Sequence, residues 1–103
     1  MKLFEVIAKL ETLDDEWCIV AKRPWSADAE AELVELTEDY RIPSAALSAG
    51  YEYFLEVSVA LDAVLDGLGA RLTSEQRVEA VIFYAENDAY PEWLYALRQE
   101  AAE

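Results

Sequence analysis

The side chains of this chain that are most able to do chemistry are carboxylates and aromatics, because histidine is absent and cysteine occurs once. The sequence has no His, which removes the commonest general base and metal ligand together with triads of the serine or cysteine type. The single cysteine, Cys18, lies in an apolar run without an adjacent cation, so we expect a small buried hydrophobe rather than a nucleophile. Glycines occur only at positions 50, 67 and 69, which leaves no glycine-rich phosphate loop. The sequence therefore predicts that the protein is not an enzyme.

Carboxylates alone could still bind Ca²⁺ or Mg²⁺, or act in pairs on glycosides. Asp14–Glu16 and Glu86–Asp88 are the places to look for a metal, but neither has the spaced ligands and the glycine of a calcium loop. Glycoside hydrolysis needs a sugar-binding cleft, which a domain this small rarely supplies. We expect no metal, no cofactor and no catalytic residue, and the remaining chemistry is recognition.

Two acidic segments that contain or adjoin aromatics are candidates for a binding surface. Tyr and Trp are enriched at interface hot spots, and neighbouring Asp or Glu side chains supply steering and ion pairs. An acidic run is also commonly just a solvated face, and Trp93 falls on a helical stripe typical of a core position. The predicted partner-binding residues are Asp28, Glu30, Glu32, Glu35 and Asp39 in the first segment, and Glu86, Asp88, Tyr90, Glu92 and Tyr95 in the second.

The overall charge narrows the class of partner. Twenty-two acidic residues against eight basic ones give a net charge of −14, a large self-repulsion for 103 residues. Phosphate contacts need Lys and Arg, so direct binding of nucleic acid or of an anionic membrane is disfavoured. The charge favours basic proteins, cations, or solubility alone. The N-terminal segment has no long apolar region with a cleavage signal, and no stretch approaches the ~18–20 apolar residues of a membrane span, so we expect a cytoplasmic protein.

The N-terminal half predicts alternating helices and strands. Leu3, Val6, Ile7 and Leu10 have helical spacing and indicate a helix over residues 2–12. The apolar, β-branched run 17–21 predicts a buried strand, and 22–25 a turn. Residues 26–36 fit a helix or a strand, and we favour a strand around 33–36 that follows an acidic loop. Pro43 and Gly50 have the positions expected at the start and just past the end of a short helix.

The C-terminal half is predicted to be helical after one more strand. In the strand 51–57, alternation places Tyr51, Tyr53, Leu55 and Val57 on one face, with Phe54 between Glu52 and Glu56 on the other. Ser58 is a candidate N-cap for a helix with an inner stripe of Leu61, Val64, Leu65 and Leu68, an outer pair Asp62 and Asp66, and a stop at Gly69. The capping box Thr73–Gln76 begins the next helix, and Tyr90 and Pro91 mark a corner between two helices. Whether 80–85 is helix or strand stays open.

No linker, repeat or low-complexity segment divides the chain, so residues 1–103 are predicted to form one globular domain. The predicted fold class is α+β. It consists of a small mixed sheet of two to three strands packed against four to five helices, with a helical C-terminal half.

The run Tyr84–Trp93, of sequence YAENDAYPEW, together with the earlier segment Tyr53–Val57 and the Leu-rich helix after it, resembles a family of small acidic bacterial proteins of largely unassigned role. In size and charge the chain also resembles the immunity proteins of contact-dependent growth inhibition. This second resemblance implies a cytoplasmic inhibitor that binds a cognate basic toxin domain, often a nuclease, and blocks its active site or its nucleic-acid surface.

Two other functions stay open at the level of sequence. One is a nucleic-acid mimic of phage or mobile-element origin that blocks a host DNA-binding or CRISPR-type effector. The other is a non-inhibitory adaptor that is acidic for solubility. A small enzyme would need a pocket that holds carboxylates with raised pKa values.

Overall fold

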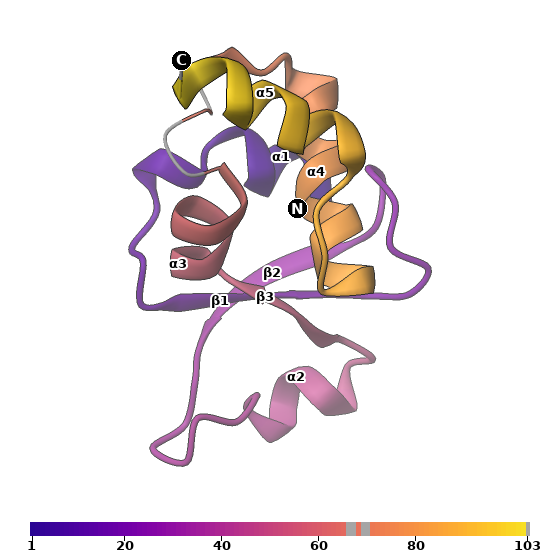
Figure 1. Ribbon diagram of the computed structural model, residues 1–103. Helices are drawn as coiled ribbons and strands as arrows, with labels where there is room; N and C mark the ends of the chain where they lie inside the picture. The colour runs from indigo at the N-terminus through magenta and orange to yellow at the C-terminus, as the bar shows by residue number, and fades with distance from the viewer. Residues whose placement is uncertain (66–67, 69–70, 103) are drawn as a thin grey trace.

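A three-stranded antiparallel sheet forms the centre of the chain in a computed structural model that describes residues 1–65, 68 and 71–102. The central strand β1 (Trp17–Ala21) lies between β2 (Ala31–Glu35) and β3 (Glu52–Glu56). Most helices lie on one side of this sheet, and a single short helix lies on the other (Figure 1). The predicted α+β class is confirmed, although both strand pairs are antiparallel where a mixed sheet was expected.

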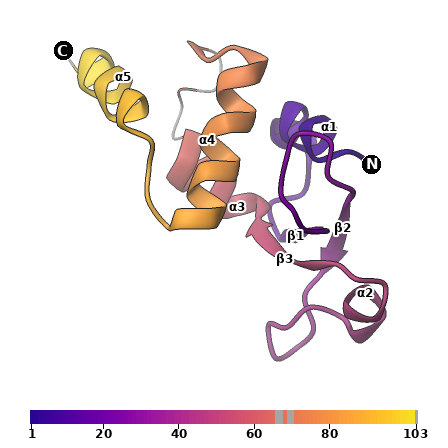
Figure 2. The ribbon, with the colours of Figure 1, turned by 90° about the vertical axis from the view of Figure 1, so that its right-hand side faces the viewer.

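The helices account for most of the C-terminal half, as predicted. In chain order they are α1 (Leu3–Ala8), the 3-10 turn η1 (Leu10–Thr12), α2 (Ser44–Ser48), α3 (Val57–Val59), the π-helical segment η2 (Ala60–Leu65), α4 (Ser74–Asn87) and α5 (Glu92–Ala102). α5 turns away from α4 at the predicted corner (Figure 2). None of the described helices is long and apolar enough to cross a membrane.

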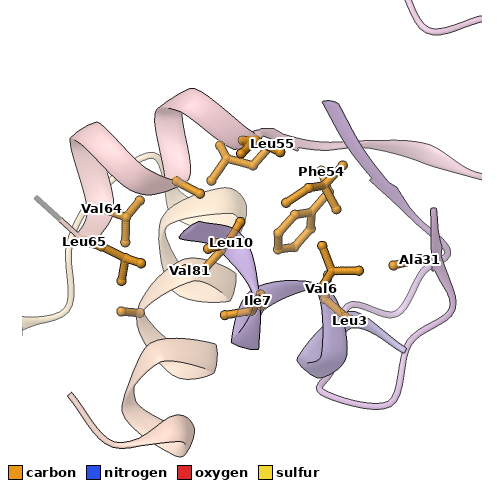
Figure 3. Packing of buried hydrophobic residues seen from close by; sticks show 14 of the residues in the cluster. Leu3, Val6, Ile7, Leu10, Ala31, Phe54, Leu55, Val64, Leu65 and Val81 are labelled. Carbon is orange, nitrogen blue, oxygen red and sulfur yellow. The ribbon is translucent and has the colours of Figure 1, made fainter. Parts of the chain in front are cut away.

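The hydrophobic core fills the space between the sheet and the helices α1, η2 and α4. Leu3, Val6 and Ile7 of α1 are fully buried, as the predicted stripe requires, and they face Phe54 of β3 (Figure 3). Val64 and Leu65 of η2 and Val81 of α4 complete the same cluster. Burying one such side chain stabilises the fold by roughly 1.5–3 kcal/mol, so this cluster holds the sheet and the helices together.

The structure resolves the two segments that the sequence left open. Residues 31–35 form a strand, because Ala31 to Glu35 pair with Ala21 to Trp17 across β1 and β2. Residues 80–85 lie inside α4, which begins at the predicted capping box. The Thr73 Oγ1 accepts from the Gln76 amide at 3.1 Å, and the Gln76 Oε1 accepts from the Thr73 amide at 2.9 Å.

The predicted faces of β3 are wrong. The register shifts between Ile19 and Val20, so that Leu55 pairs with Ile19 and Tyr53 with Val20, which leaves Phe54 as the extra residue of a bulge. Phe54 and Leu55 are therefore both buried, while Tyr53 is 44% exposed. The bulge breaks the strict alternation that the prediction assumed.

The predicted N-cap Ser58 is also wrong. The cap position is Glu56, because the strand turns directly into the helix and the first helical residue, Val57, is needed in the core. The Ser58 amide instead donates to the Asp15 carbonyl at 3.2 Å. Of the predicted inner stripe, Val64, Leu65 and Leu68 are buried and Leu61 is partly buried. Asp62 is exposed as expected, and Asp66 and Gly69 lie outside the described residues.

The connection between β2 and β3, residues 36–51, carries α2 away from the helical side of the molecule (Figure 1). α2 contains no buried residue, and Leu47 is 53% exposed. Gly50 ends it with φ 92°, a conformation that glycine adopts at little cost, which confirms the predicted stop. This connection forms an arm, defined here as residues 36–51, that projects beside the end of β2.

A candidate binding hollow at the end of the sheet

The antiparallel register gathers the start of β1 and the ends of β2 and β3 at one end of the sheet. Trp17 pairs with Glu35, and Cys18 pairs with Glu56 on its other side. A hollow of about 550 Å³ opens at this point. Four carboxylates and two aromatic side chains contribute to its lining, namely Asp15, Glu16, Glu35, Glu56, Trp17 and Tyr40. We call this feature the acidic hollow.

Short-range hydrogen bonds hold the β1 side of the acidic hollow. The Glu16 amide donates to the Asp14 Oδ1 at 2.9 Å, and the Trp17 amide donates to the Asp14 carbonyl at 3.2 Å. These bonds form a turn of the type that Asp side chains favour. The bond from Ser58 to the Asp15 carbonyl then fixes this turn against the beginning of α3. The turn that carries the carboxylates of Asp15 and Glu16 is therefore fixed by hydrogen bonds on both sides.

The arm supplies the opposite side of the hollow through a tight loop at Thr37–Arg41. The Tyr40 amide donates to the Thr37 carbonyl at 2.8 Å, and the Thr37 amide donates to the Arg41 carbonyl at 2.9 Å. The Arg41 amide also donates to the Thr37 Oγ1 at 3.2 Å. Tyr40 at the tip has φ 59° and is 85% exposed.

The basic side chains of the described part of the chain do not neutralise the acidic hollow by ion pairing. No basic residue contributes to its lining, and among the described residues none of its four carboxylates forms an ion pair. Several bases are engaged elsewhere, in the pairs Lys22–Glu30 at 3.1 Å, Arg23–Glu52 at 3.4 Å and Arg77–Glu11 at 2.6 Å. Four carboxylates around one concavity repel one another and attract a cation placed between them.

The perturbed pKa values belong to side chains outside the lining of the acidic hollow. Hydrogen bonding to Arg77 lowers the pKa of Glu11, and hydrogen bonding to Lys22 lowers that of Glu30. Burial, with the nearby Glu56 charge, raises the pKa of Cys18 to about 12. The buried thiol donates to the carbonyls of Ile19 and Leu55, so the prediction of a buried cysteine is confirmed. Among the described residues no cluster of three or more acidic or sulfur ligands could hold a metal ion.

The structure divides the first predicted patch. Glu35 lines the acidic hollow, and Asp39 lies beside Tyr40 in the loop of the arm. Glu30 and Glu32 border a separate hollow of about 330 Å³, where Glu30 pairs with Lys22. Asp28 is exposed in the loop before β2. Only the end of this segment therefore joins the acidic hollow.

The second predicted patch lies at the opposite end of the sheet, at the C-terminal end of α4 (Figure 1). Its acids Glu86, Asp88 and Glu92 are exposed, and Tyr95 is 50% exposed. Tyr90, which was expected outside, is partly buried, because it packs on the core with the Arg98 guanidinium 4.3 Å from its ring centre. We call this group the corner patch.

The corner patch borders a hollow of its own, of about 380 Å³, which is mainly aromatic and aliphatic. Asp88 is the acid in its lining, beside Trp25, Tyr53 and Tyr84. Trp25 packs edge-on against Phe54 with 5.0 Å between ring centres, so part of this lining belongs to the core. The hollow at the corner patch is therefore lined by one carboxylate, whereas the acidic hollow is lined by four.

Sequence reasoning missed most of the acidic hollow. Asp15 and Glu16 were considered only as a metal site, and Glu56 only as a residue on the face of a strand opposite Tyr53 and Leu55. The signal that could have found them is the pairing of strand ends, because antiparallel pairing of 17–21 with the two other strands places Trp17 beside Glu35 and near Glu56.

The fold and this surface define a small α+β domain that presents acidic, aromatic-lined concavities. The chain belongs to the family described as a domain of unknown function (DUF7716), whose model matches residues 1–93. Comparison with curated proteins and with solved structures found no match. Every residue of the acidic hollow falls inside the matched range, whereas Tyr95 of the corner patch falls outside it.

Proposed function

We propose that this protein is an acidic inhibitor of the immunity type, which binds a cognate basic toxin domain in the cytoplasm and neutralises it. The observation that carries the proposal is the acidic hollow, where four carboxylates without an internal ion pair surround a concavity of about 550 Å³. A nuclease binds its substrate through Lys and Arg side chains, and the hollow offers these cations carboxylates in place of phosphates.

Physical considerations assign different roles to charge and to aromatic side chains. One carboxylate and one cation about 4 Å apart attract each other by about 1 kcal/mol in water and by about 4 kcal/mol at an effective dielectric constant of about 20. The net charge of −14 extends this attraction over the whole surface and accelerates association. Trp17 and Tyr40 at the hollow add contact area of the kind that slows dissociation.

The first test is capture of the partner. The tagged protein is incubated at low salt with lysate of its source and eluted along a salt gradient, and the eluted proteins are identified by mass spectrometry. The proposal expects one basic protein, retained in stoichiometric amount to high salt, whose toxic activity is blocked by the complex. Capture of a host DNA-binding protein would favour the nucleic-acid mimic instead. Elution of many basic proteins together at modest salt would favour an acidic adaptor.

The second test locates the interface with three pairs of charge reversals that change the net charge equally. They are Glu16→Lys with Glu35→Lys in the acidic hollow, Glu86→Lys with Glu92→Lys in the corner patch, and Asp62→Lys with Glu100→Lys as an exposed control pair on the helices. We expect the hollow pair to slow association about tenfold or more at low salt, because steering depends on charge near the contact. The control pair should slow it about threefold or less. If all three pairs slowed association equally, the result would contradict a localised interface. If the corner pair slowed association most, the interface would be assigned to the corner patch.

A further inference from the structure

Tyr40 is the most exposed large apolar side chain of the described residues, at 85%. Its φ of 59° lies in the left-handed region, where the Cβ of an L-residue crowds the following carbonyl and where Gly or Asn is the common choice. The three hydrogen bonds of the loop Thr37–Arg41 need no side chain at residue 40. A ring that hardly packs on its own protein occupies a position that a smaller residue would fill more easily. Such an outlier is a reason to look for a function of the side chain.

The surroundings of Tyr40 indicate which chemical group its ring would meet. Tyr40 lines the acidic hollow together with Trp17, so aromatic residues and carboxylates lie around one concavity. A guanidinium is planar, stacks on aromatic faces and forms paired hydrogen bonds with a carboxylate, whereas an ammonium is a compact and strongly hydrated charge. Aromatic and acidic groups in combination therefore favour arginine over lysine.

The chain arranges its own arginines in this manner. The Arg23 guanidinium carbon lies 3.5 Å from the centre of the Trp25 ring, and its Nε lies 3.4 Å from a carboxylate oxygen of Glu52. Arg98 stacks on Tyr90 and donates to the carbonyls of Ala63 and Val64 at 2.6 and 2.9 Å. An aromatic ring with an oxygen acceptor is thus a stable environment for a guanidinium in this molecule. The Lys22 ammonium, which pairs with Glu30 at 3.1 Å, also lies over a ring, but at the longer distance of 5.0 Å from the centre of Tyr51.

We propose that the acidic hollow accepts an arginine side chain of the basic partner, and that Tyr40 is the residue that selects a guanidinium over an ammonium. The inference rests on the proposed function in that it names the group of the partner that the hollow contacts. Its test does not need the partner, so that the two proposals can fail separately.

The test is an NMR titration of the full ¹⁵N-labelled chain with two blocked peptides of equal charge, hexa-arginine and hexa-lysine. The Trp17 indole and the amides of Glu16, Glu35 and Arg41 report on the acidic hollow. We expect both peptides to bind, with hexa-arginine tighter by about fivefold and its largest shifts at the hollow. Equal affinities, or largest shifts at the corner patch, would overturn the inference.

Variants at residue 40 separate the role of the ring from that of the fold. Tyr40→Gly should lower the preference for arginine to about twofold or less, because the stacking face is lost. The melting temperature should stay unchanged or rise by a few degrees, about 2–5 °C, because glycine relieves the left-handed strain and part of this gain is offset by its flexibility when unfolded. Tyr40→Phe keeps the ring and should keep the preference. Tyr95→Ala removes an exposed ring from the corner patch and should also keep it.

Two outcomes would refute the role of Tyr40, namely a Tyr40→Gly variant that retains the fivefold preference, or a Tyr95→Ala variant that loses it. A chain that prefers arginine at the hollow but captures no basic protein from lysate would refute the proposed function and leave the arginine site standing. A chain that captures a basic partner without any preference for arginine would refute the arginine site and leave the proposed function standing.

Discussion

Arg77 of α4 joins three elements, and its removal tests whether the N-terminal helix is held by this contact. The Nη1 of Arg77 donates to the Glu11 Oε2 at 2.8 Å, and its Nη2 donates to the Glu11 Oε1 at 2.6 Å and to the Ile7 carbonyl at 3.1 Å. The Arg77 side chain is only 11% exposed, whereas that of Glu11 is 53% exposed. Because Ile7 lies in the last turn of α1, the guanidinium also satisfies a carbonyl at a helix end.

The size of the effect follows from this geometry. An ion pair in contact gains about 1–4 kcal/mol for effective dielectric constants between about 80 and 20, and the exposure of Glu11 places this pair near the lower end, at about 1–2 kcal/mol. The bond to Ile7 adds about 0.5–1.5 kcal/mol. Arg77→Met keeps an unbranched stem in place, so we expect a loss of about 2–3 kcal/mol in the free energy of unfolding. The melting temperature should fall by about 10 °C or more.

The assay is urea unfolding of a double-mutant cycle with Arg77→Met, Glu11→Gln and both changes. The coupling energy should be about 1–2 kcal/mol at pH 7. Arg71→Met is a matched control, because it removes the same charge from an exposed side chain just before α4 and should cost about 0.5 kcal/mol or less. A coupling below about 0.3 kcal/mol would refute the assignment of the contact.

The pH dependence of the free energy of unfolding tests the Arg77–Glu11 pair independently. Arg77 lowers the pKa of folded Glu11 below the ordinary value of 4.5, so that the unfolded chain binds more protons between the two values. The stabilisation by this pair is therefore complete above about pH 4.5 to 5 and is lost as the pH falls through the lower, folded pKa. The difference in stability between the wild type and Glu11→Gln should shrink from pH 6 to pH 3. A difference that is constant over this range would contradict the pairing.

Three further outcomes are expected from the same structure. Added NaCl of about 0.5 M should raise the melting temperature at pH 7, because screening reduces the self-repulsion of the net charge of −14, and a fall in calorimetry would contradict this. Cys18 should react with a thiol reagent in urea but not in the native state, because the thiol is buried and burial raises its pKa to about 12. Labelling within minutes without urea would show that β1 opens in the native state. Arg98→Met should accelerate hydrogen exchange in α5 more than in α4, because Arg98 holds α5 to the carbonyls of η2. Equal protection of α5 in the wild type and in Arg98→Met would exclude this role.

Much of the fold could be predicted because local patterns agree with tertiary packing. The stripe of α1, the apolar run of β1 and the capping box at Thr73 each specify an element without help from distant residues. Residues 31–35 are different, because the segment 26–36 fits helical spacing as well as the alternation of a strand, and only pairing with β1 decides for a strand. The bulge at Phe54 depends on register across strands, which no local pattern contains.

The same distinction applies to the site. Glu35 could be found as a member of an acidic run, because charge runs are visible in sequence. Asp15, Glu16 and Glu56 could not be grouped with it, because they become neighbours only through the register of β1 with both partner strands and through the turn from β3 into α3. Tyr90 was assigned to the surface because acidic residues surround it in the sequence. In the structure it packs against the core, and Arg98 covers its ring.

The acidic hollow combines two features that folding alone would not favour. The described ion pairs use Lys22, Arg23 and Arg77 away from the hollow, and none of them involves its four carboxylates. The left-handed Tyr40 borders the same concavity. Repulsion and backbone strain each disfavour the folded state, and a sequence selected only for stability would avoid their coincidence. Because such local conflicts are expected at functional sites, their meeting at the end of β2 is a stronger reason to propose a binding site there than the total acidity of the chain.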